Sequence, residues 1–274
     1  MAALKDNLLN PRPWSGLMMG NHALARAMVE SGTRVITTFP GSPTPEIAQA
    51  LTRIPKNERP YYFEYSTNEK VALELAAGAS LNGHLSSVFF KSVGLNVASD
   101  SMIQLSLMAL IGGMVVILGD DPGANSSQNE QDNRHFARMA AIPMFEPATP
   151  QEAYEMYLEA AKLSKQLKAP VCVRTTTHVS HAKEVVQFGS IKTGPLDWTP
   201  RFSKENGPYI PIVKAVFPLK QRALEKLEKW ATLSEKSTFN QTLSPNPSST
   251  QEKKRRGLIS TGLPALALLE NLAE

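Results

Sequence analysis

Cysteine is almost missing from the 274-residue sequence, which contains Cys172 alone. A single thiol cannot form an internal disulfide, and it cannot supply the roughly four ligands that an iron–sulfur cluster needs. The surrounding residues, Val-Cys-Val-Arg-Thr, are typical of a buried strand, so we expect Cys172 to be a small core residue. The composition fits a reducing compartment, and the expected localisation is cytoplasmic.

Long apolar runs are also lacking. The most apolar stretch, residues 102–118, contains Gln104 and Ser106 and is interrupted by Gly112 and Gly113. It is shorter than the roughly 20 residues of a typical membrane span, and a buried helix followed by a buried strand explains it better. The N-terminus has no continuous apolar segment of signal-peptide length, so we expect no membrane association.

The basic charge of the chain is not gathered into a nucleic-acid-binding motif. The net charge is +4, and the one basic cluster, Lys253 to Arg256, lies in a stretch rich in Ser, Pro and Asn. That context indicates a solvated linker, so no nucleic-acid partner is expected. The chain also lacks the GxGxxG, GxxxxGK[ST] and GxSxG fingerprints of dinucleotide, P-loop and serine-hydrolase sites. His178 and His181 lie three residues apart, but no third metal ligand accompanies them.

What the chain does contain is a regular alternation of short apolar runs and helical patterns from residue 20 to residue 176. We expect strands at residues 33–39, 61–65, 86–91 and 114–119, near Met144, and at 170–175. Helices are expected at residues 21–31, 43–51, 67–81, 96–110, up to about Ala140, and at 150–167. Thr67 or Asn68 is the expected cap of one helix, and Asn96 that of another. The alternation predicts an α/β fold with a parallel sheet sandwiched by helices.

Beyond residue 180 this pattern weakens. We expect four units: an α/β domain at 14–182, an irregular and helical extension at 183–233, a flexible linker at 234–256, and the start of a second α/β unit at 257–274. Residues 185–212 are expected to be irregular, 215–233 to form one helix, and 257–262 to form a strand. Because the sequence stops inside the last unit, we expect a truncated product or a split subunit completed by another chain.

Four polar loops follow the first four strands of the expected sheet. Their sequences are FPGSP, STNE, KSVGLN and GDDPGANSSQN. Ligands of parallel α/β sheets bind outside the carboxyl ends of the strands, so these loops predict a site for a polar ligand. Glu69, in the second loop, opens a helix, where the helix dipole favours an acid in any case. Spacing alone therefore does not separate a catalytic Glu69 from one that merely stabilises its helix.

Taken in order, several segments resemble one enzyme family. The segments are GNHALARAMVESG, FPGSPTPEI, STNEKVALELAAGASLNG, KSVGLNVASD, DDPGANSSQNEQDNRHFARMA and RTTTHVSH. They are similar to the N-terminal domain of the large subunit of indolepyruvate ferredoxin oxidoreductases, within the wider pyruvate and 2-oxoacid:ferredoxin oxidoreductase family. The similarity covers about residues 14–182 and, weakly, 257–274. It implies the pyrimidine-binding domain of a thiamine-diphosphate fold.

The resemblance implies an activity as well as a fold. Enzymes of this family decarboxylate an arylpyruvate oxidatively, attach the acyl group to coenzyme A and pass the electrons through iron–sulfur clusters to ferredoxin. The implied partners are a diphosphate-binding domain or second chain, a beta subunit and ferredoxin. The magnesium–diphosphate motif of thiamine enzymes, Gly-Asp-Gly with a later Asn, is absent: the chain has Gly119–Asp120–Asp121 and no Asn between Asn133 and Asn206. We therefore expect no metal site here, and iron–sulfur clusters only on a missing region or a partner.

The resemblance also assigns roles to individual residues. Glu69 matches the family glutamate that touches the pyrimidine ring nitrogen, where a carboxylic acid in a dry pocket can share its proton. The expected cofactor-binding residues are Gly41, Ser42 and Asn96, and the expected substrate-binding residues are Ser92, Gln128 and Asn129. Ser92 departs from relatives that carry His in this loop. Two alternatives stay open: a non-catalytic binding or assembly module with the family fold, and a subunit acting on another 2-oxoacid.

Overall fold

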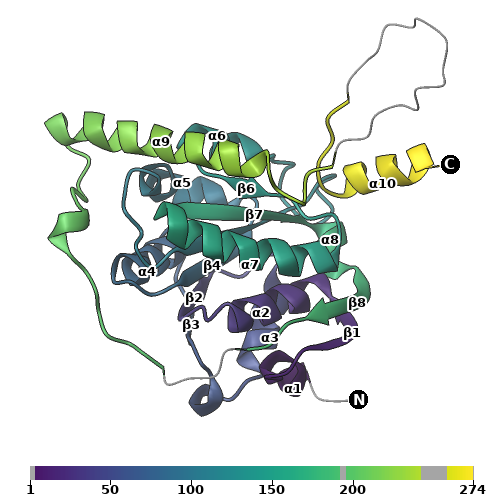
Figure 1. Cartoon of the computed structure of the whole chain (residues 1–274). Helices are drawn as coiled ribbons and strands as arrows, with labels where there is room; N and C mark the ends of the chain where they lie inside the picture. Colours follow the sequence, from purple (N-terminus) through teal and green to yellow (C-terminus); the bar gives the residue numbers. More distant parts are fainter. Residues whose placement is uncertain (1–3, 192–195, 242–257, 274) are drawn as a thin grey trace, which may run out of the picture.

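The computed structural model describes residues 4–191, 196–241 and 258–273. Its centre is a six-stranded sheet in the order β3-β2-β4-β5-β7-β6, in which all neighbours pair in parallel (Figure 1). The strands are β2 (Val35–Thr38), β3 (Tyr62–Tyr65), β4 (Ser86–Lys91), β5 (Met114–Asp120), β6 (Met144–Phe145) and β7 (Pro170–Thr176). The parallel sheet expected from the sequence is therefore confirmed.

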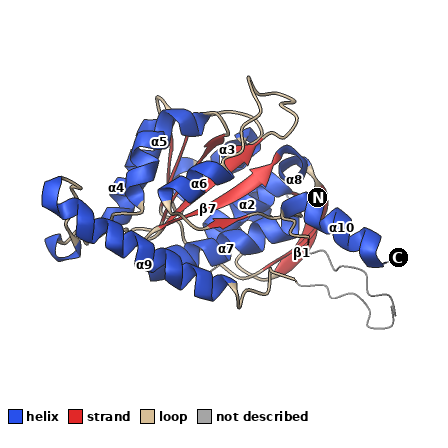
Figure 2. Cartoon of the chain, turned by 90° about the horizontal axis from the view of Figure 1, so that it is seen from above, coloured by secondary structure: helices blue, strands red, loops and turns tan. Residues whose placement is uncertain are grey.

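Helices cover both faces of this sheet. The helices are α1 (Leu4–Leu9), α2 (Gly20–Glu30), α3 (Pro45–Thr52), α4 (Glu69–Leu81), α5 (Gly94–Leu105), α6 (Arg134–Ala140), α7 (Pro150–Leu167), α8 (Thr177–His181), α9 (Val216–Ser234) and α10 (Gly262–Ala273). Viewed from above in Figure 2, α2 and α7 lie on one side of the strands, and α4 and α5 lie on the other. The expected sandwich of helices around the sheet is thus confirmed.

The strands divide the hydrophobic core because their side chains alternate between the two faces. Phe89 and Ile117 join the cluster under α2 and α7, whereas Phe90 and Leu118 join the cluster under α4 and α5. Every residue of β5 is buried, as befits the middle of a parallel sheet covered on both sides. Cys172 lies fully buried in the second cluster, where burial raises the pKa of its thiol well above its usual range. Its expected role as a core residue is confirmed.

A second, two-stranded sheet was not predicted. Strand β1 (Trp14–Met19) pairs antiparallel with β8 (Lys183–Phe188), with Trp14 opposite Phe188 and Met19 opposite Lys183. The sequence placed no strand before residue 20 and expected residues 185–212 to be irregular. Both strands are short, and each forms only because the other is present, far away along the chain. The fully buried Arg26 secures this corner by donating to the carbonyls of Leu8, Asn10 and Gly189.

Helix α9 confirms the expected helix at 215–233 and lies along one side of the domain (Figure 1). Trp230 of α9 packs against the domain, where its ring meets the ring of Phe145 edge-on with centroids 5.3 Å apart. Phe239 also packs on Phe145, so the beginning of the expected linker contacts the domain. The rest of that linker, including Lys253 to Arg256, lies outside the described residues. None of the helices described has the length and apolarity needed to cross a membrane.

Two local expectations are wrong. Residues 258–261 form no strand, and α10 begins directly at Gly262, although a helix was expected just beyond. Asn96 does not cap α5, which begins two residues earlier after Val93 and has no side-chain cap. The other cap is confirmed, because the Asn68 side chain accepts the N–H of Val71 at 2.9 Å. Lys56–Glu58, Lys204–Asn206 and Val213–Ala215 form single 3₁₀ turns. The boundaries of the four expected units stay a prediction.

Candidate functional site

The four polar loops lie together at the carboxyl edge of the sheet. Thr38 at the end of β2 is in register with Tyr65 of β3 and Phe89 of β4, and Lys91 of β4 is in register with Gly119 of β5. The chain leaves all four strands on the same side, because the strands are parallel. The loops at 39–44, 66–69, 92–94 and 121–133 therefore form one surface, as the sequence predicted.

Glu69 is a buried carboxylate without a partner. It is the first residue of α4, directly after the capping residue Asn68, and its side chain is only 7% exposed. Within the described part of the chain it makes no hydrogen bond or ion pair. Its carboxylate rests against the backbone of Gly94, since a Cβ built there would lie 2.6 Å from Glu69 Oε1. A buried carboxylate that lacks a partner is costly, so this group is available for a ligand.

Lys91 connects two of the loops. A Cβ built on Gly41 would lie 2.5 Å from Lys91 Cδ, so the lysine stem fills the space beside Gly41. The Lys91 amine then donates to Gln128 Oε1 at 2.9 Å. Thr44 fixes the same turn by donating its N–H and its hydroxyl to the Gly41 carbonyl. Sequence reasoning missed Lys91, although a lysine ending an otherwise apolar strand was the available signal.

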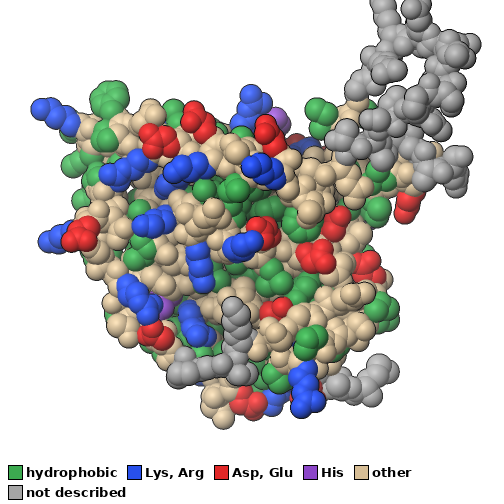
Figure 3. Space-filling model, viewed as in Figure 1, with side chains coloured by type: hydrophobic (Ala, Val, Ile, Leu, Met, Phe, Trp, Pro, Cys, Tyr) green, Lys and Arg blue, Asp and Glu red, His purple; other side chains and the backbone are tan. Residues whose placement is uncertain are grey.

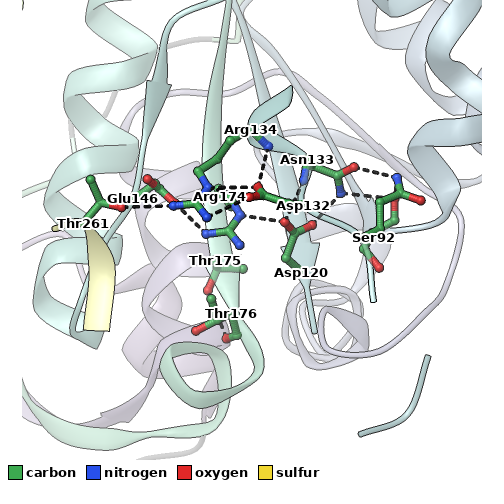
Figure 4. Close-up of polar contacts among 11 residues, drawn as sticks. Ser92, Asp120, Asp132, Asn133, Arg134, Glu146, Arg174, Thr175, Thr176 and Thr261 are labelled. Atoms are coloured by element: carbon green, nitrogen blue, oxygen red, sulfur yellow. Dashed lines mark hydrogen bonds and ion pairs between the residues drawn. The ribbon is translucent and has the colours of Figure 1, made fainter. Parts of the chain in front are cut away.

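Ser92 is held through its backbone rather than its hydroxyl. The side chain is 1% exposed, and its hydroxyl has no hydrogen-bond partner. Its N–H donates to the Gly119 carbonyl at 2.8 Å. Its carbonyl accepts from the amides of Gln131 and Asn133, each at 3.2 Å (Figure 4). Ser92 therefore lies beneath the surface of the candidate site.

Asp120 is the centre of a buried polar network. It is fully buried and accepts from Asn133 and from Arg174, whose Nε lies 2.6 Å from Oδ2 (Figure 4). Arg174 reaches Glu146 on its other side at 2.5 Å. Burial raises the pKa of the Asp120 carboxyl, and the charge of Arg174 opposes that rise. The Asp120 carboxylate is therefore held by contacts within the fold.

Asp121 also accepts several hydrogen bonds from its neighbours. Its oxygens accept from the Ser126 N–H at 2.7 Å, the Thr177 hydroxyl at 2.9 Å and the Asn125 amide at 3.1 Å. Burial would raise the pKa of Asp121, but these hydrogen bonds outweigh it and hold the pKa well below its usual range. Neither aspartate of the Gly-Asp-Asp step has a free face for a metal. In the described ranges, no three His, Cys, Asp or Glu side chains form a metal-binding group.

The remaining candidate residues lie around the same edge. Ser42 is half-buried, whereas Asn96 on α5 and the loop residues Gln128 and Asn129 are exposed. The structure thus joins Glu69 to the Ser92–Gly94 turn, and Gly41 to Gln128, but it shows no contact of Asn96 or Asn129 with this group.

Two pockets, of about 190 and 410 Å³, lie at the opposite edge of the sheet. They are lined by basic residues that include Arg34, Lys168 and Arg222, and Figure 3 shows Lys and Arg side chains gathered over this end. Neither pocket contains a candidate residue. Basic side chains there already bind backbone carbonyls of the protein: Arg34 donates to the Pro60 carbonyl, and Arg222 donates to the Gly207 carbonyl. We place the site at the carboxyl edge, where the unpaired acid lies.

Comparison with known proteins agrees with this geometry. Residues 26–236 match the family model described as "Pyruvate flavodoxin/ferredoxin oxidoreductase, thiamine diP-bdg". Indolepyruvate oxidoreductase subunit IorA of Methanothermobacter marburgensis is 41% identical over 89% of this chain and 38% of its own length. The same subunit of Thermococcus kodakarensis is 37% identical over the whole chain and 42% of its own length. The chain spans about two fifths of the length of these relatives.

Solved structures show the same fold at low sequence identity. A 2-oxoglutarate:ferredoxin oxidoreductase from Magnetococcus marinus matches 80% of this chain and 45% of its own, with a TM-score of 0.63 and 15% identity. A thiamine diphosphate-dependent 4-hydroxybenzoylformate decarboxylase from Rhodococcus jostii matches 60% of this chain and 31% of its own, with a TM-score of 0.51 and 16% identity. The match of the family model to most of the chain shows that this protein belongs to the thiamine-diphosphate-binding family of pyruvate flavodoxin/ferredoxin oxidoreductases.

Proposed function

We propose that this chain supplies the aminopyrimidine-binding half of the thiamine diphosphate site in a 2-oxoacid:ferredoxin oxidoreductase. The substrate we propose is indolepyruvate or a related arylpyruvate, as in the relatives named indolepyruvate oxidoreductase. The observation that carries the proposal is Glu69, a buried carboxylate at the carboxyl edge of a parallel sheet that has no partner in the part of the chain that the structure describes. Family membership indicates that the ligand is thiamine diphosphate, and Glu69 is the acid that we propose to act on it.

The residues at this edge fit the aminopyrimidine end of the cofactor. An acid that is 7% exposed and unpaired can donate a hydrogen bond to a ring nitrogen and share the proton with it. No donor among the described residues competes for its oxygens. Thiamine diphosphate itself supplies the electron sink for decarboxylation of a 2-oxoacid. Glu69 is therefore the proposed catalytic residue, since it holds the proton at the ring nitrogen.

The other candidate residues take supporting roles in this proposal. Ser42 offers a hydroxyl and Asn96 an exposed amide to the cofactor. Gly41, whose open side is filled by the Lys91 stem, would contribute to cofactor binding through its backbone, in the turn that carries Ser42. Gln128 and Asn129 are exposed in the longest loop of this edge, where they can reach a substrate. Ser92 is buried, so it would act on the substrate through the shape of its loop.

The diphosphate end does not fit this chain. Asp120 and Asp121 already accept hydrogen bonds from their neighbours, and the described residues hold no metal-binding group. We therefore assign magnesium and the diphosphate to another domain or chain. Exposed apolar side chains near Glu69, such as Val71 (40% exposed) and Val97 (49% exposed), favour a covering partner at this edge.

Electron transfer is also assigned to other regions. The one cysteine is buried in the core, so iron–sulfur clusters belong to a partner or to a segment outside this chain. A beta subunit, ferredoxin as electron acceptor and coenzyme A as acyl acceptor complete the proposed enzyme. Its proposed compartment is the cytoplasm, which is reducing.

The test is Glu69→Gln in the complete enzyme, assembled from this chain and the subunits that carry the diphosphate and cluster domains. Acyl-CoA formation and reduction of a viologen acceptor should fall by about 10²–10⁴-fold, because the amide cannot share a proton. Glu74→Gln is the matched control, since Glu74 lies on the same helix, is exposed and pairs with Lys70 and Ser101. A near-wild-type rate for Glu69→Gln would overturn the assigned role and favour a binding module.

The substrate requires a separate measurement. The same assay with indolepyruvate, phenylpyruvate, pyruvate and 2-oxoglutarate should give the highest kcat/KM for an arylpyruvate. A clear preference for pyruvate or 2-oxoglutarate would reject the arylpyruvate assignment and leave the role of Glu69 intact.

A further inference from the structure

The Ser92 carbonyl is clamped from two sides. Asn133 Nδ2 donates to it at 3.2 Å (Figure 4), and Gln131 Nε2 does so at the same distance. The Leu95 N–H also donates to it, from within the turn. The Ser92 N–H is fixed at the same time by the Gly119 carbonyl at 2.8 Å. Both polar groups of this residue's backbone are therefore bound by neighbouring elements, and the turn has little freedom to move.

Asn133 can act as a clamp because it is itself locked. It is fully buried, its Oδ1 accepts from Gln131 at 2.7 Å, and its Nδ2 bonds both the Ser92 carbonyl and Asp120. Its backbone N–H also donates to Asp120 at 3.1 Å. Arg174 completes the support through the 2.6 Å bond to the same carboxylate. A side-chain network in which each member is satisfied is rigid, because each alternative arrangement leaves a buried group unpaired.

The clamped turn leads directly to Glu69. Gly94 follows Ser92 by two residues and opens α5. Its backbone is in contact with the Glu69 side chain along its length, since a Cβ there would lie 2.6 Å from Oε1, 2.7 Å from Cγ and 2.9 Å from Cδ. Since no hydrogen bond from the described residues holds the Glu69 carboxylate, its packing against this backbone fixes its position.

We infer that Gln131 and Asn133 are positioning residues for Glu69, acting through the Ser92 carbonyl and the Gly94 backbone. The inference rests on the proposed role of Glu69. It gives the Gly-Asp-Asp loop a function other than metal binding: Asp120 anchors the clamp that aims the catalytic carboxylate. The side-chain amides of Gln131 and Asn133, on the loop after β5, thereby set the position of the Glu69 carboxylate, which follows β3.

The test is Gln131→Glu, which keeps the shape of the side chain but turns a carboxylate oxygen toward the Ser92 carbonyl and Asn133 Oδ1. Gln131 is partly exposed, so the chain should fold. We expect kcat of the complete enzyme to fall by about 10- to 100-fold, as for a catalytic group displaced by ~1 Å, with KM nearly unchanged. Gln131→Ala, which removes the clamp without repulsion, should give a smaller loss. Gln104→Glu, a partly exposed change on α5, is the matched control.

A second readout needs neither cofactor nor turnover. In this chain, labelled with ¹³C at the glutamate carboxyl carbon, the Glu69 resonance should move in both Gln131 variants and stay in place in Gln104→Glu. An unchanged resonance together with an unchanged kcat would overturn the inference. The two proposals fail separately. If Glu69→Gln retains activity, the proposed function fails, whatever the resonance shows. If Glu69→Gln is inactive and the Gln131 variants behave as wild type, the positioning inference alone is wrong.

Discussion

Gly94→Ala should separate the stability of the fold from the activity of the enzyme. Gly94 is the first residue of α5, and its φ lies outside the left-handed range that favours glycine, so alanine can adopt its backbone conformation. The added methyl would lie 2.6 Å from Glu69 Oε1. An ordinary contact starts at about 3.4 Å, so the carboxylate has to retreat by ~0.8 Å.

Folding and catalysis should respond to this displacement by different amounts. The atoms that must move run from Cγ through Cδ to Oε1 of Glu69, so the whole buried side chain has to shift, and overpacking of this kind costs about 1–3 kcal/mol. Alanine favours a helix over glycine by up to about 1 kcal/mol, which offsets part of this cost, so the free energy of unfolding should fall by no more than about 2 kcal/mol. A catalytic group displaced by ~1 Å can lose about 10²-fold in rate, so kcat should fall by roughly 10- to 100-fold.

The assay pairs urea unfolding of this chain with turnover of the complete enzyme. Gly78→Ala is the control, because Gly78 lies on α4 with Glu69 and a Cβ there meets nothing within 4 Å. It should stabilise the chain by up to about 1 kcal/mol and leave kcat unchanged. If Gly94→Ala also leaves kcat unchanged while Glu69→Gln abolishes it, then the contact with Gly94 does not fix the carboxylate, and the reasoning is refuted.

Two further predictions concern stability. Lys226→Met should lower the free energy of unfolding by about 1–3 kcal/mol, because the Lys226 amine donates to the carbonyls of Ser106, Met108 and Lys168. Methionine removes this donor, and of the three carbonyls that of Lys168 keeps the Leu110 N–H. Unchanged stability in urea denaturation would contradict this. Hydrogen bonds from Arg134 lower the pKa of Asp132 to about 2 from an ordinary value of 3.8, so its stabilising contribution is complete above pH ~4 and is lost as the pH falls toward 2. Asp132→Asn should therefore flatten the acid limb of stability against pH, and an equally steep limb in the variant would reject the assignment.

The sheet and its carboxyl edge could be predicted because they depend on local patterns. An apolar run such as MVVILG predicts a strand that is buried on both faces. The helix expected at 67–81 has its capping residue, Asn68, in its own sequence. Parallel order then places the following loops at one edge without any knowledge of long-range contacts. Glu69, Gly41 and Ser92 lie at this edge for the same reason, and their roles there stay a prediction.

The elements that were missed depend on partners distant in sequence. The sequence of β8 taken alone predicts irregular structure, because the strand forms by pairing with β1. No local pattern in either segment indicates that the other is its partner. Lys91 looks like the polar end of a strand, and its link between Gly41 and Gln128 exists only once three loops meet. The clamp on Ser92 is of the same kind, because its donors lie 39 and 41 residues further along the chain.

The three acids of this edge show what separates a structural from a functional carboxylate. By spacing alone, Glu69 cannot be told from an ordinary first-turn acid, and only the family resemblance assigned it a catalytic role and left Asp120 and Asp121 without a metal. The hydrogen bonds of the three acids now give a physical reason for the same distinction. Both aspartates receive several hydrogen bonds, so a ligand would have to displace partners that already stabilise the buried charge. Glu69 is buried and has no such partner among the described residues, so a ligand that hydrogen-bonds to it would offset its desolvation. Of the three acids, the one without hydrogen bonds from the described residues is for that reason the one that we propose for the cofactor.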